Sequence, residues 1–457
     1  MTTQLVLVST PESLLAAAAA VDAELLGSPR ERVLVTVAAP GFPELDVPLS
    51  GRAGIEGLLD RFDRVVSVDD LIGPLDPRTW SPSGGDRPVL EPLLRAYWGL
   101  ADGPVEVVVD AEDEQPGEWL TSVFYGCLVT VLGSTLRAYG PVPGSPSWGW
   151  GRRVHRHLYV DRVPGLLPWS PDHSDAEPVA IPAPAWDGVL ASVGAPIPPT
   201  PAGSTVGLVV GENLAGRRLA SHDDETRLLE TMVRAAADDG AEHVVVVPDP
   251  ADPVVLGQRL AGVTQELAAR GITVTVAAAG PPPEAWLAAV RPAVVVGCFA
   301  PVLLAAHAAG VRARSVGAAE VKERLTPYSH PDRIPHTLVD AVLRDGSPWA
   351  SVTDLRALVR TVAHCMYPER LASLRDEAAA TLAATTDAEV RRYPTMRRAQ
   401  QLRLLETADP AAAQSAGTPA SAESSNSADA VRRGGRMLLN RLSARRAGAK
   451  SKGTRPS

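Results

Sequence analysis

The stretch that most constrains the fold is a run of four valines, Val244 to Val247, which is followed by Pro248-Asp249-Pro250. An uninterrupted β-branched run of this length is typical of a strand buried on both faces, as in the interior of a parallel sheet. Pro248 ends the strand because proline has no N–H to donate to the ladder. Ligands of open α/β sheets bind just beyond the carboxyl ends of the strands. Asp249 is therefore expected to lie close to whatever the protein binds.

Similar apolar runs alternate with helical patterns along most of the chain. Further strands are predicted at residues 4–8, 33–37, 64–68, 105–109, 127–131, 157–160, 205–210, 272–276, 294–298 and 311–316. Helices are predicted at residues 11–26, 55–62, 86–100, 119–125, 222–237, 254–270, 283–290, 301–309, 354–364 and 369–384. Strands that alternate with helices in this way predict βαβ units and a doubly wound parallel sheet.

At 457 residues the chain is too long for one hydrophobic core, so more than one domain is expected. A proline-rich segment at 169–204 interrupts the rhythm and predicts a linker. We therefore predict an α/β fold with two Rossmann-like domains facing a cleft, at residues 1–168 and 205–405. This is the GT-B-like architecture of many nucleotide-sugar glycosyltransferases, with the acceptor on the first domain and the donor on the second.

Composition narrows the setting in which the protein works. The net charge of -9 gives no global reason to expect nucleic-acid binding. Three widely spaced cysteines form neither a disulfide framework nor a CxxC pair for zinc, which favours a reducing cytoplasm. No apolar run reaches the roughly 18 residues of a membrane-spanning helix, so we expect a soluble cytoplasmic protein.

Residues 406–457 form a tail rich in Ala, Ser and Thr that we predict to be disordered. It ends in a basic run that begins at Arg432. Residues 437–442 have the pattern of a short amphipathic helix that could bind an anionic membrane surface, which would make the protein peripheral at the membrane. The composition favours the alternative interpretation, a solvated flexible tail.

Several short motifs, taken in order, connect the chain with a known family. They are Arg61-Phe-Asp-Arg-Val-Val66, Tyr139-Gly-Pro141, His157-Leu-Tyr-Val-Asp-Arg-Val-Pro-Gly-Leu166, Gly211-Glu-Asn-Leu214, Val295-Val-Gly-Cys-Phe299, Arg324-Leu-Thr-Pro-Tyr328 and Val339-Asp-Ala-Val-Leu343. In these motifs the chain resembles the bacterial α-2,8-polysialyltransferase family, in its actinobacterial form, over about residues 4–345. The resemblance implies a GT-B-like fold and CMP-sialic acid as the donor.

The resemblance also implies three active-site motifs, and the first of them is altered here. The family has an acid-acid-Gly motif a few residues before a Tyr, and one acid would act as general base on the acceptor hydroxyl. The matching place before Tyr139 reads Gly133-Ser134-Thr135, which contains no carboxylate. The nearby acids at 110–114 belong to the preceding strand and loop, and we interpret them as a solvated loop.

The other two motifs are altered as well. The family's His-Pro pair, whose His would assist departure of the donor phosphate, is matched by Asp249-Pro250. An ionised Asp about 4 Å from that phosphate would cost roughly 1–4 kcal/mol. The family's Ser/Thr pair, which would hold an acidic group of the donor, is matched by Ala300-Pro301. Ala300 has no hydroxyl, and Pro301 removes one N–H from the expected anion site.

These differences lead to two main hypotheses about function. The first is a pseudo-glycosyltransferase that has lost normal sialyl transfer and still binds a nucleotide sugar, a glycan or a partner enzyme. The second is an active glycosyltransferase that uses rearranged residues such as Glu212, Asp249 or the acids near Asp110. A weaker third is a surface-associated scaffold guided by the basic tail. Candidate donor-binding residues are Gly211, Glu212, Asn213, Asp249, Gly297, Cys298, Ala300 and Pro301.

Other combinations of residues do not indicate a cofactor site. The glycines at 207, 211 and 216 do not match the GxGxxG fingerprint, and no Walker A sequence is present. His155 and His157 lack the carboxylate or cysteine spacing of a metal site, so no metal is expected. Cys298, in an apolar strand, is interpreted as a small buried hydrophobic residue. Arg217-Arg218 is interpreted as a solvated pair at a helix start, in preference to an anion site.

Overall fold

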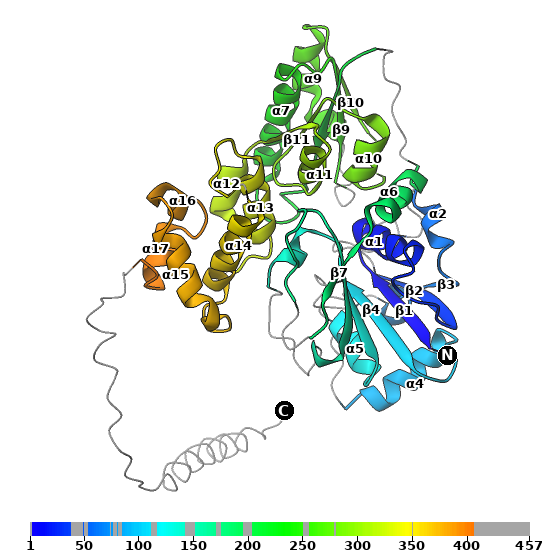
Figure 1. Ribbon diagram of the computed structural model, residues 1–457. Helices are drawn as coiled ribbons and strands as arrows, with labels where there is room; N and C mark the ends of the chain where they lie inside the picture. The colour runs from blue at the N-terminus through cyan, green and yellow to red at the C-terminus, as the bar shows by residue number, and fades with distance from the viewer. Residues whose placement is uncertain are drawn as a thin grey trace, which may run out of the picture. The chain divides into compact units, whose positions relative to one another are not determined.

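The computed structural model describes residues 2–37, 49, 54–73, 75, 80, 85–110, 117–141, 151–170, 175–194, 203–249, 256–277, 280–349 and 351–405. These residues form two parallel sheets covered by helices, which confirms the predicted α/β class with two Rossmann-like, GT-B-like domains (Figure 1). The predicted tail at 406–457, including its basic run and the segment 437–442, lies outside the described residues. Within the described ranges, no helix has the length and apolar composition needed to cross a membrane.

The first sheet has the strand order β3-β2-β1-β4-β5-β6-β7. Its strands are β1 (Thr3–Val8), β2 (Glu31–Thr36), β3 (Arg64–Ser67), β4 (Val105–Asp110), β5 (Leu128–Gly133), β6 (Val154–Val160) and β7 (Pro178–Ile181). Its helices are α1 (Pro11–Asp22), α2 (Glu56–Leu59), α3 (Asp69–Ile72), α4 (Arg87–Tyr97), α5 (Gly117–Val123) and α6 (Ala183–Ser192), with the 3-10 turns η2 (Leu136–Tyr139) and η3 (Gly151–Arg153).

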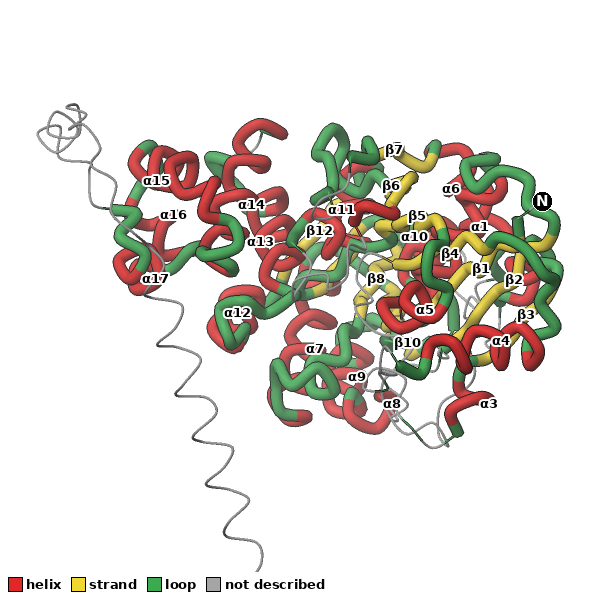
Figure 2. Tube along the Cα trace, turned by 90° about the horizontal axis from the view of Figure 1, so that it is seen from below, coloured by secondary structure: helices red, strands yellow, loops and turns green. Residues whose placement is uncertain are grey.

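Strand β1 shows why the apolar runs are continuous. Leu5 and Leu7 point into a core beneath α4 and α5, whereas Val6 and Val8 point into a second core beneath α1 and α6. Figure 2 shows α1 and α6 on one side of the sheet and α4 and α5 on the other. Because both faces of the strand are buried, alternation of apolar and polar residues is absent, as expected for a parallel sheet.

The second sheet has the order β10-β9-β8-β11-β12. Its strands are β8 (Val206–Val210), β9 (His243–Val247), β10 (Thr273–Val276), β11 (Val294–Gly297) and β12 (Arg312–Ser315). Its helices are α7 (His222–Asp238), α8 (Leu256–Arg259), α9 (Ala261–Ala268), α10 (Pro283–Val290), α11 (Val302–Ala308), α12 (Ala318–Arg324) and α13 (Arg333–Leu343). The four-valine strand β9 lies between β8 and β10, so its predicted interior position is confirmed.

The segment expected to be a linker differs most from its prediction. Residues 178–181 form β7, which pairs with β6 in parallel, and residues 183–192 form α6 against α1. Prolines are tolerated here because β7 is an edge strand and because α6 has its prolines at the first turn. The linker prediction is therefore wrong for residues 178–192, which belong to the first domain.

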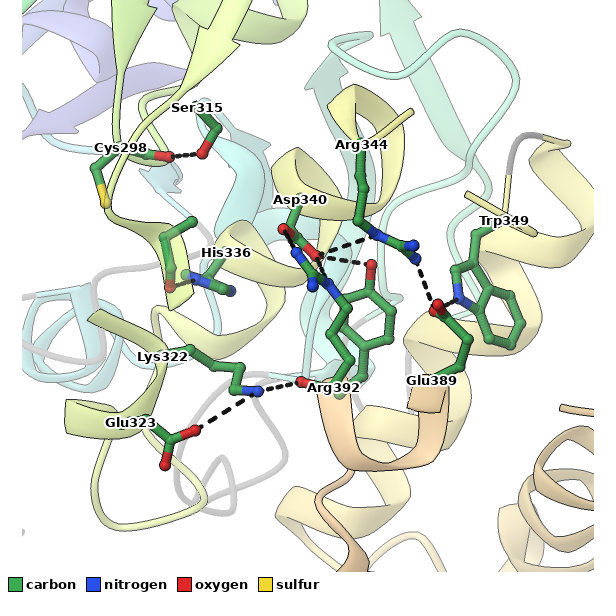
Figure 3. A network of polar contacts seen from close by, with 12 residues as sticks. Cys298, Ser315, Lys322, Glu323, His336, Asp340, Arg344, Trp349, Glu389 and Arg392 are labelled. Carbon is green, nitrogen blue, oxygen red and sulfur yellow. Dashed lines mark hydrogen bonds and ion pairs between the residues drawn. The ribbon is translucent and has the colours of Figure 1, made fainter. Parts of the chain in front are cut away.

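The helical end of the chain is held by a buried polar network on α13 (Figure 3). This end of the chain comprises α14 (Val352–Met366), the 3-10 turn η4 (Ala372–Leu374), α15 (Arg375–Ala383), α16 (Asp387–Arg392) and α17 (Met396–Gln401). Asp340 accepts two bonds from Arg392, at 2.5 and 2.6 Å, and one from Tyr393 Oη at 2.9 Å. Glu389 accepts from Arg344 Nη2 at 2.7 Å and from Trp349 Nε1 at 2.9 Å. These bonds attach α16 to the second domain.

The two domains share part of one core. Leu136 and Tyr139 on η2, with Val163 in the loop after β6, pack into the apolar cluster of the second domain. The contact is close at Gly140, where an added Cβ would stand 2.7 Å from Cγ1 of Ile334 on α13. The geometry of any site formed between residues of the two domains is therefore held by packed side chains.

Candidate functional site

Strand ends of the first domain bring three polar groups together. Asp110 ends β4, Ser134 follows β5 and Arg162 lies two residues beyond β6, and all three are buried. The Ser134 hydroxyl donates a short hydrogen bond to Asp110 Oδ2. Arg162 Nε donates to the Ser134 carbonyl at 3.0 Å. The interpretation of Asp110 as part of a solvated loop is therefore wrong, while residues 111–114 lie outside the described residues.

Residues 133–135, where the resemblance implies an acid motif, are fixed by local packing and hydrogen bonds. Gly133 is required by close packing, because an added Cβ would meet the Ala138 Cβ at 2.8 Å. Thr135 caps η2 by accepting the Arg137 N–H at 3.2 Å. Ser134 has in Asp110 the partner carboxylate that sequence reasoning did not assign to it.

Arg162 also joins the two domains. Its Nη1 atom donates to Glu284 Oε1, on the first turn of α10, at 2.5 Å. Both side chains are only 4% exposed, so this is a buried ion pair. A buried pair of this kind costs desolvation of both charges, and removal of one partner leaves the other uncompensated. Neither residue was singled out as a site residue from the sequence.

Glu12 lies on the first turn of α1, just beyond the end of β1. Thr10 caps this helix, and its side chain accepts the Ser13 N–H at 3.1 Å, which confirms the predicted helix start. Desolvation, followed by the negative charge of Glu284, raises the pKa of Glu12 to about 7. Asp249 acts in the same direction and Arg162 opposes it. The electrostatic coupling places Glu12 near residues of both domains.

Asp249 lies just beyond the carboxyl end of β9, as the sequence predicted, and its closeness to a ligand stays a prediction. The Gly211 N–H donates to the Val247 carbonyl at 2.8 Å, which places the end of β8 next to the end of β9. Pro250, the other half of the altered His-Pro motif, lies outside the described residues. Asp249, Glu12 and Glu284 make this part of the site acidic.

Glu212 follows β8 and binds the turn after β11. Its Oε1 atom accepts the N–H groups of Cys298 at 2.5 Å and Phe299 at 2.9 Å. Gly297 makes the approach possible, because a Cβ there would stand 3.2 Å from the same oxygen. Burial raises the pKa of Glu212 to about 7, against the opposing effect of the backbone N–H groups and of Arg217. The turn that was expected to hold an anion of a donor thus holds a carboxyl of the chain itself.

The remaining candidate residues surround this turn. Cys298 is a buried free thiol, and burial raises its pKa well above the usual range. The thiol is therefore uncharged, which agrees with its interpretation as a small buried hydrophobic residue. Its carbonyl accepts the Ser315 hydroxyl at 2.5 Å (Figure 3). Ala300 is buried, and Pro301 directly precedes α11. Asn213 has a positive φ of 47° and accepts the Gly216 N–H at 3.1 Å.

Arg217 is not a solvated residue at a helix start, because α7 begins at His222. Its guanidinium pairs with Asp332 at 2.6 Å, and Arg137 of the first domain pairs with the same carboxylate at 2.6 Å. Burial opposes ionisation of Asp332, but Arg217 and Arg137 outweigh it and lower the pKa of this carboxyl. Arg218 is exposed, as expected.

The histidines of the first domain do not form a metal site. His157 is fully buried in β6, and burial lowers its pKa to about 4, so the ring is neutral at physiological pH. His155 Nδ1 lies 3.1 Å from the Val129 carbonyl. Over the described ranges, no three His, Cys, Asp or Glu residues are grouped so as to hold a metal ion.

Comparisons with known proteins give a fold likeness only. No family model and no curated protein matches the chain. Solved structures with a similar fold include a UDP-N-acetylglucosamine 2-epimerase from Listeria monocytogenes, a Phytolacca americana UGT2 complexed with UDP-2fluoro-glucose, and the Escherichia coli ADP-heptose LPS heptosyltransferase II.

The first two are each 11% identical to the chain, with TM-scores of 0.39 and 0.38. The epimerase match covers 80% of this chain and 97% of that one, and the UGT2 match covers 84% and 100%. The heptosyltransferase is 10% identical, with a TM-score of 0.30 and coverage of 67% and 82%. At this level of similarity, ligand and reaction must be inferred from the chain's own residues. Its strand orders and paired domains give it a GT-B-like, glycosyltransferase-type fold.

Proposed function

We propose that the chain is a polysialyltransferase-like protein that has lost ordinary sialyl transfer and keeps its cleft for binding a nucleotide sugar or glycan. The observation that carries this proposal is the contact of Glu212 with the N–H groups of Cys298 and Phe299. A donor such as CMP-sialic acid is anionic at its phosphate and its carboxylate. The N–H groups that would hold such an anion are already bound to a carboxyl group.

The acids on the facing strand ends support the same conclusion. Asp249 stands in place of the expected His and is coupled to Glu12, so this part of the site offers carboxyl groups to the donor. Arg162, a nearby cation, is paired with Glu284. Carboxyl groups bind sugar hydroxyls well because they accept hydrogen bonds from them, whereas they repel phosphate.

Calorimetric titration with CMP, CMP-sialic acid, and UDP and GDP sugars tests the proposal. We expect no sialyl transfer, and weak or absent binding of CMP-sialic acid. Among nucleotide sugars, we expect those with an uncharged sugar to bind more tightly than CMP-sialic acid, because the sialyl carboxylate adds an anion beside the acidic residues. The Glu212→Gln variant, in which the carboxyl charge is removed, should bind CMP more tightly than wild type. Sialyl transfer by the wild-type protein would refute the proposal.

A second candidate function is favoured by the raised pKa of Glu12. A carboxylate with a pKa of about 7 at a strand-end site is well suited to act as general base on an acceptor hydroxyl. An active glycosyltransferase would then use Glu12 in place of the altered acid motif. If transfer from any nucleotide sugar is detected, Glu12→Gln should lower kcat by about 10²-fold or more. Glu24→Gln, an exposed acid just beyond the same helix, is the matched control.

A further inference from the structure

A pocket of about 450 Å³ opens between the two domains, next to the Arg162–Glu284 ion pair. It is lined by residues of the loop after β6, of α6 in the first domain, and of α10 and α11 in the second. None of the candidate donor-binding residues lines it, whereas Asp161, Arg162 and Pro164 of the motif at 157–166 do. A pocket of this size holds a small ligand of a few rings.

One wall of the pocket is aromatic and apolar. Trp186 on α6 is half-buried, and the Arg162 guanidinium lies 5.3 Å from its ring centroid. Leu190 on α6 and Leu287 on α10 continue the apolar surface. A flat aromatic side chain with aliphatic neighbours offers a surface on which the C–H face of a sugar ring can pack.

The polar groups of the pocket are nearly balanced in charge. Its lining includes the carboxyl groups of Asp161, Asp187 and Glu284 and the guanidinium groups of Arg162 and Arg291. The Arg162 side chain is only 4% exposed, and its Nη2 atom has no hydrogen-bond partner among the described residues. The groups that a ligand can reach are the Arg291 guanidinium and the Asp187 carboxyl, which line the pocket at exposed positions.

We propose that this pocket binds an uncharged saccharide. Its hydroxyls would accept from Arg291 and donate to Asp187, while one ring face packs on Trp186. A polyanionic ligand gains little from a lining with three carboxyl groups and two guanidinium groups. A purely apolar ligand would cover the charged groups of Asp187 and Arg291 without supplying hydrogen-bond partners. The inference rests on the proposed function, because it specifies the glycan that the cleft binds as one made of uncharged sugar units.

The test is titration of the full chain with maltotriose, cellotriose and chitotriose, each up to about 10 mM, which detects millimolar affinity. We expect wild type to bind at least one of the three. Ala288→Phe places a ring in the pocket from an exposed position on α10, and it should weaken binding at least tenfold. Ala289→Phe changes the next exposed residue of the same helix, which does not line the pocket, and should leave binding unchanged.

Two results would overturn the inference. One is the absence of binding for all three saccharides, and the other is equal binding by wild type and Ala288→Phe. Titration of the same variants with nucleotide sugars separates this inference from the proposed function. If Ala288→Phe loses saccharide binding but keeps nucleotide binding, the result supports a saccharide pocket that is separate from the nucleotide site. Sialyl transfer by wild type together with a working pocket would refute only the proposed function.

Discussion

Replacement of Glu212 by Gln tests how the altered donor site is held together. Glu212 is 7% exposed, and folding raises its pKa from 4.5 to about 7. Each pKa unit corresponds to about 1.4 kcal/mol, so the ionised carboxylate costs the folded state about 3 kcal/mol relative to the unfolded chain. Glutamine has nearly the same shape and keeps an oxygen that can accept the N–H groups of Cys298 and Phe299.

The sign of the pH effect follows from proton linkage. Between pH 4.5 and 7 the folded protein holds a proton on Glu212 that the unfolded chain releases. The stability contributed by this group is therefore largest below pH 4.5, falls as the pH rises to 7, and is constant above it. Glu12 behaves in the same way because its pKa is also raised to about 7.

The assay is guanidinium-induced unfolding of wild type and Glu212→Gln at pH 5, 6, 7 and 8. The unfolding free energies of the two proteins should also differ by an amount that does not depend on pH, because the amide NH₂ of Gln needs a buried partner. The free-energy difference between the two proteins should change by about 2.5 kcal/mol in favour of Gln from pH 5 to pH 8. Glu369→Gln, at an exposed position, is the matched control. Parallel stability curves for wild type and Glu212→Gln would refute the argument.

Two further changes test the contact between the domains. Gly140→Ala should destabilise the protein by about 1–3 kcal/mol, because its Cβ would meet Ile334 at 2.7 Å. In the control Gly188→Ala, on α6, the added Cβ meets nothing within 4 Å, and the change should stabilise the protein by roughly 0.5–1 kcal/mol. Thermal unfolding compares the two variants, and equal effects would contradict the packing argument. Asp332→Ala should cost about 1–3 kcal/mol and hasten proteolysis between the domains, because Arg137 and Arg217, each about one third exposed, lose a buried partner. An exposed control, Glu24→Ala, should change neither quantity. An unchanged cleavage rate in Asp332→Ala would contradict the argument.

The fold could be predicted where burial is two-sided. Strands β1, β4, β8 and β9 are short apolar runs whose residues fill cores on both faces of a sheet, and that pattern is visible in the sequence. Helix α13 was not predicted because Arg333, His336 and Asp340 make it look polar although all three are buried. Their burial depends on partners such as Arg392, which is 52 residues from Asp340. Local periodicity contains no information on such distant pairs.

The candidate site could be predicted only in part, for a similar reason. Asp249 and Glu212 were found because they directly follow predicted strands. Glu12 and Glu284 lie on first turns of helices, where acids are common as helix-starting residues, and nothing local separates that role from a site. A stronger signal was available in hindsight for Glu12, since it lies only four residues after the end of β1. Its importance depends on Glu284, which belongs to the other domain.

At each of the three places where the resemblance implies an active-site motif, another residue of the chain interacts with the site. Ser134 is bound to Asp110, the turn after β11 is bound to Glu212, and Asp249 is coupled to Glu12. Restoring a His at position 249 would leave Glu212 on the N–H groups of Cys298 and Phe299, and Pro301 would still lack its N–H. A donor phosphate would then meet one favourable group and an anion site that remains occupied. Under the proposed function, each of these positions is held by another residue of the chain, so sialyl transfer would require several coordinated substitutions.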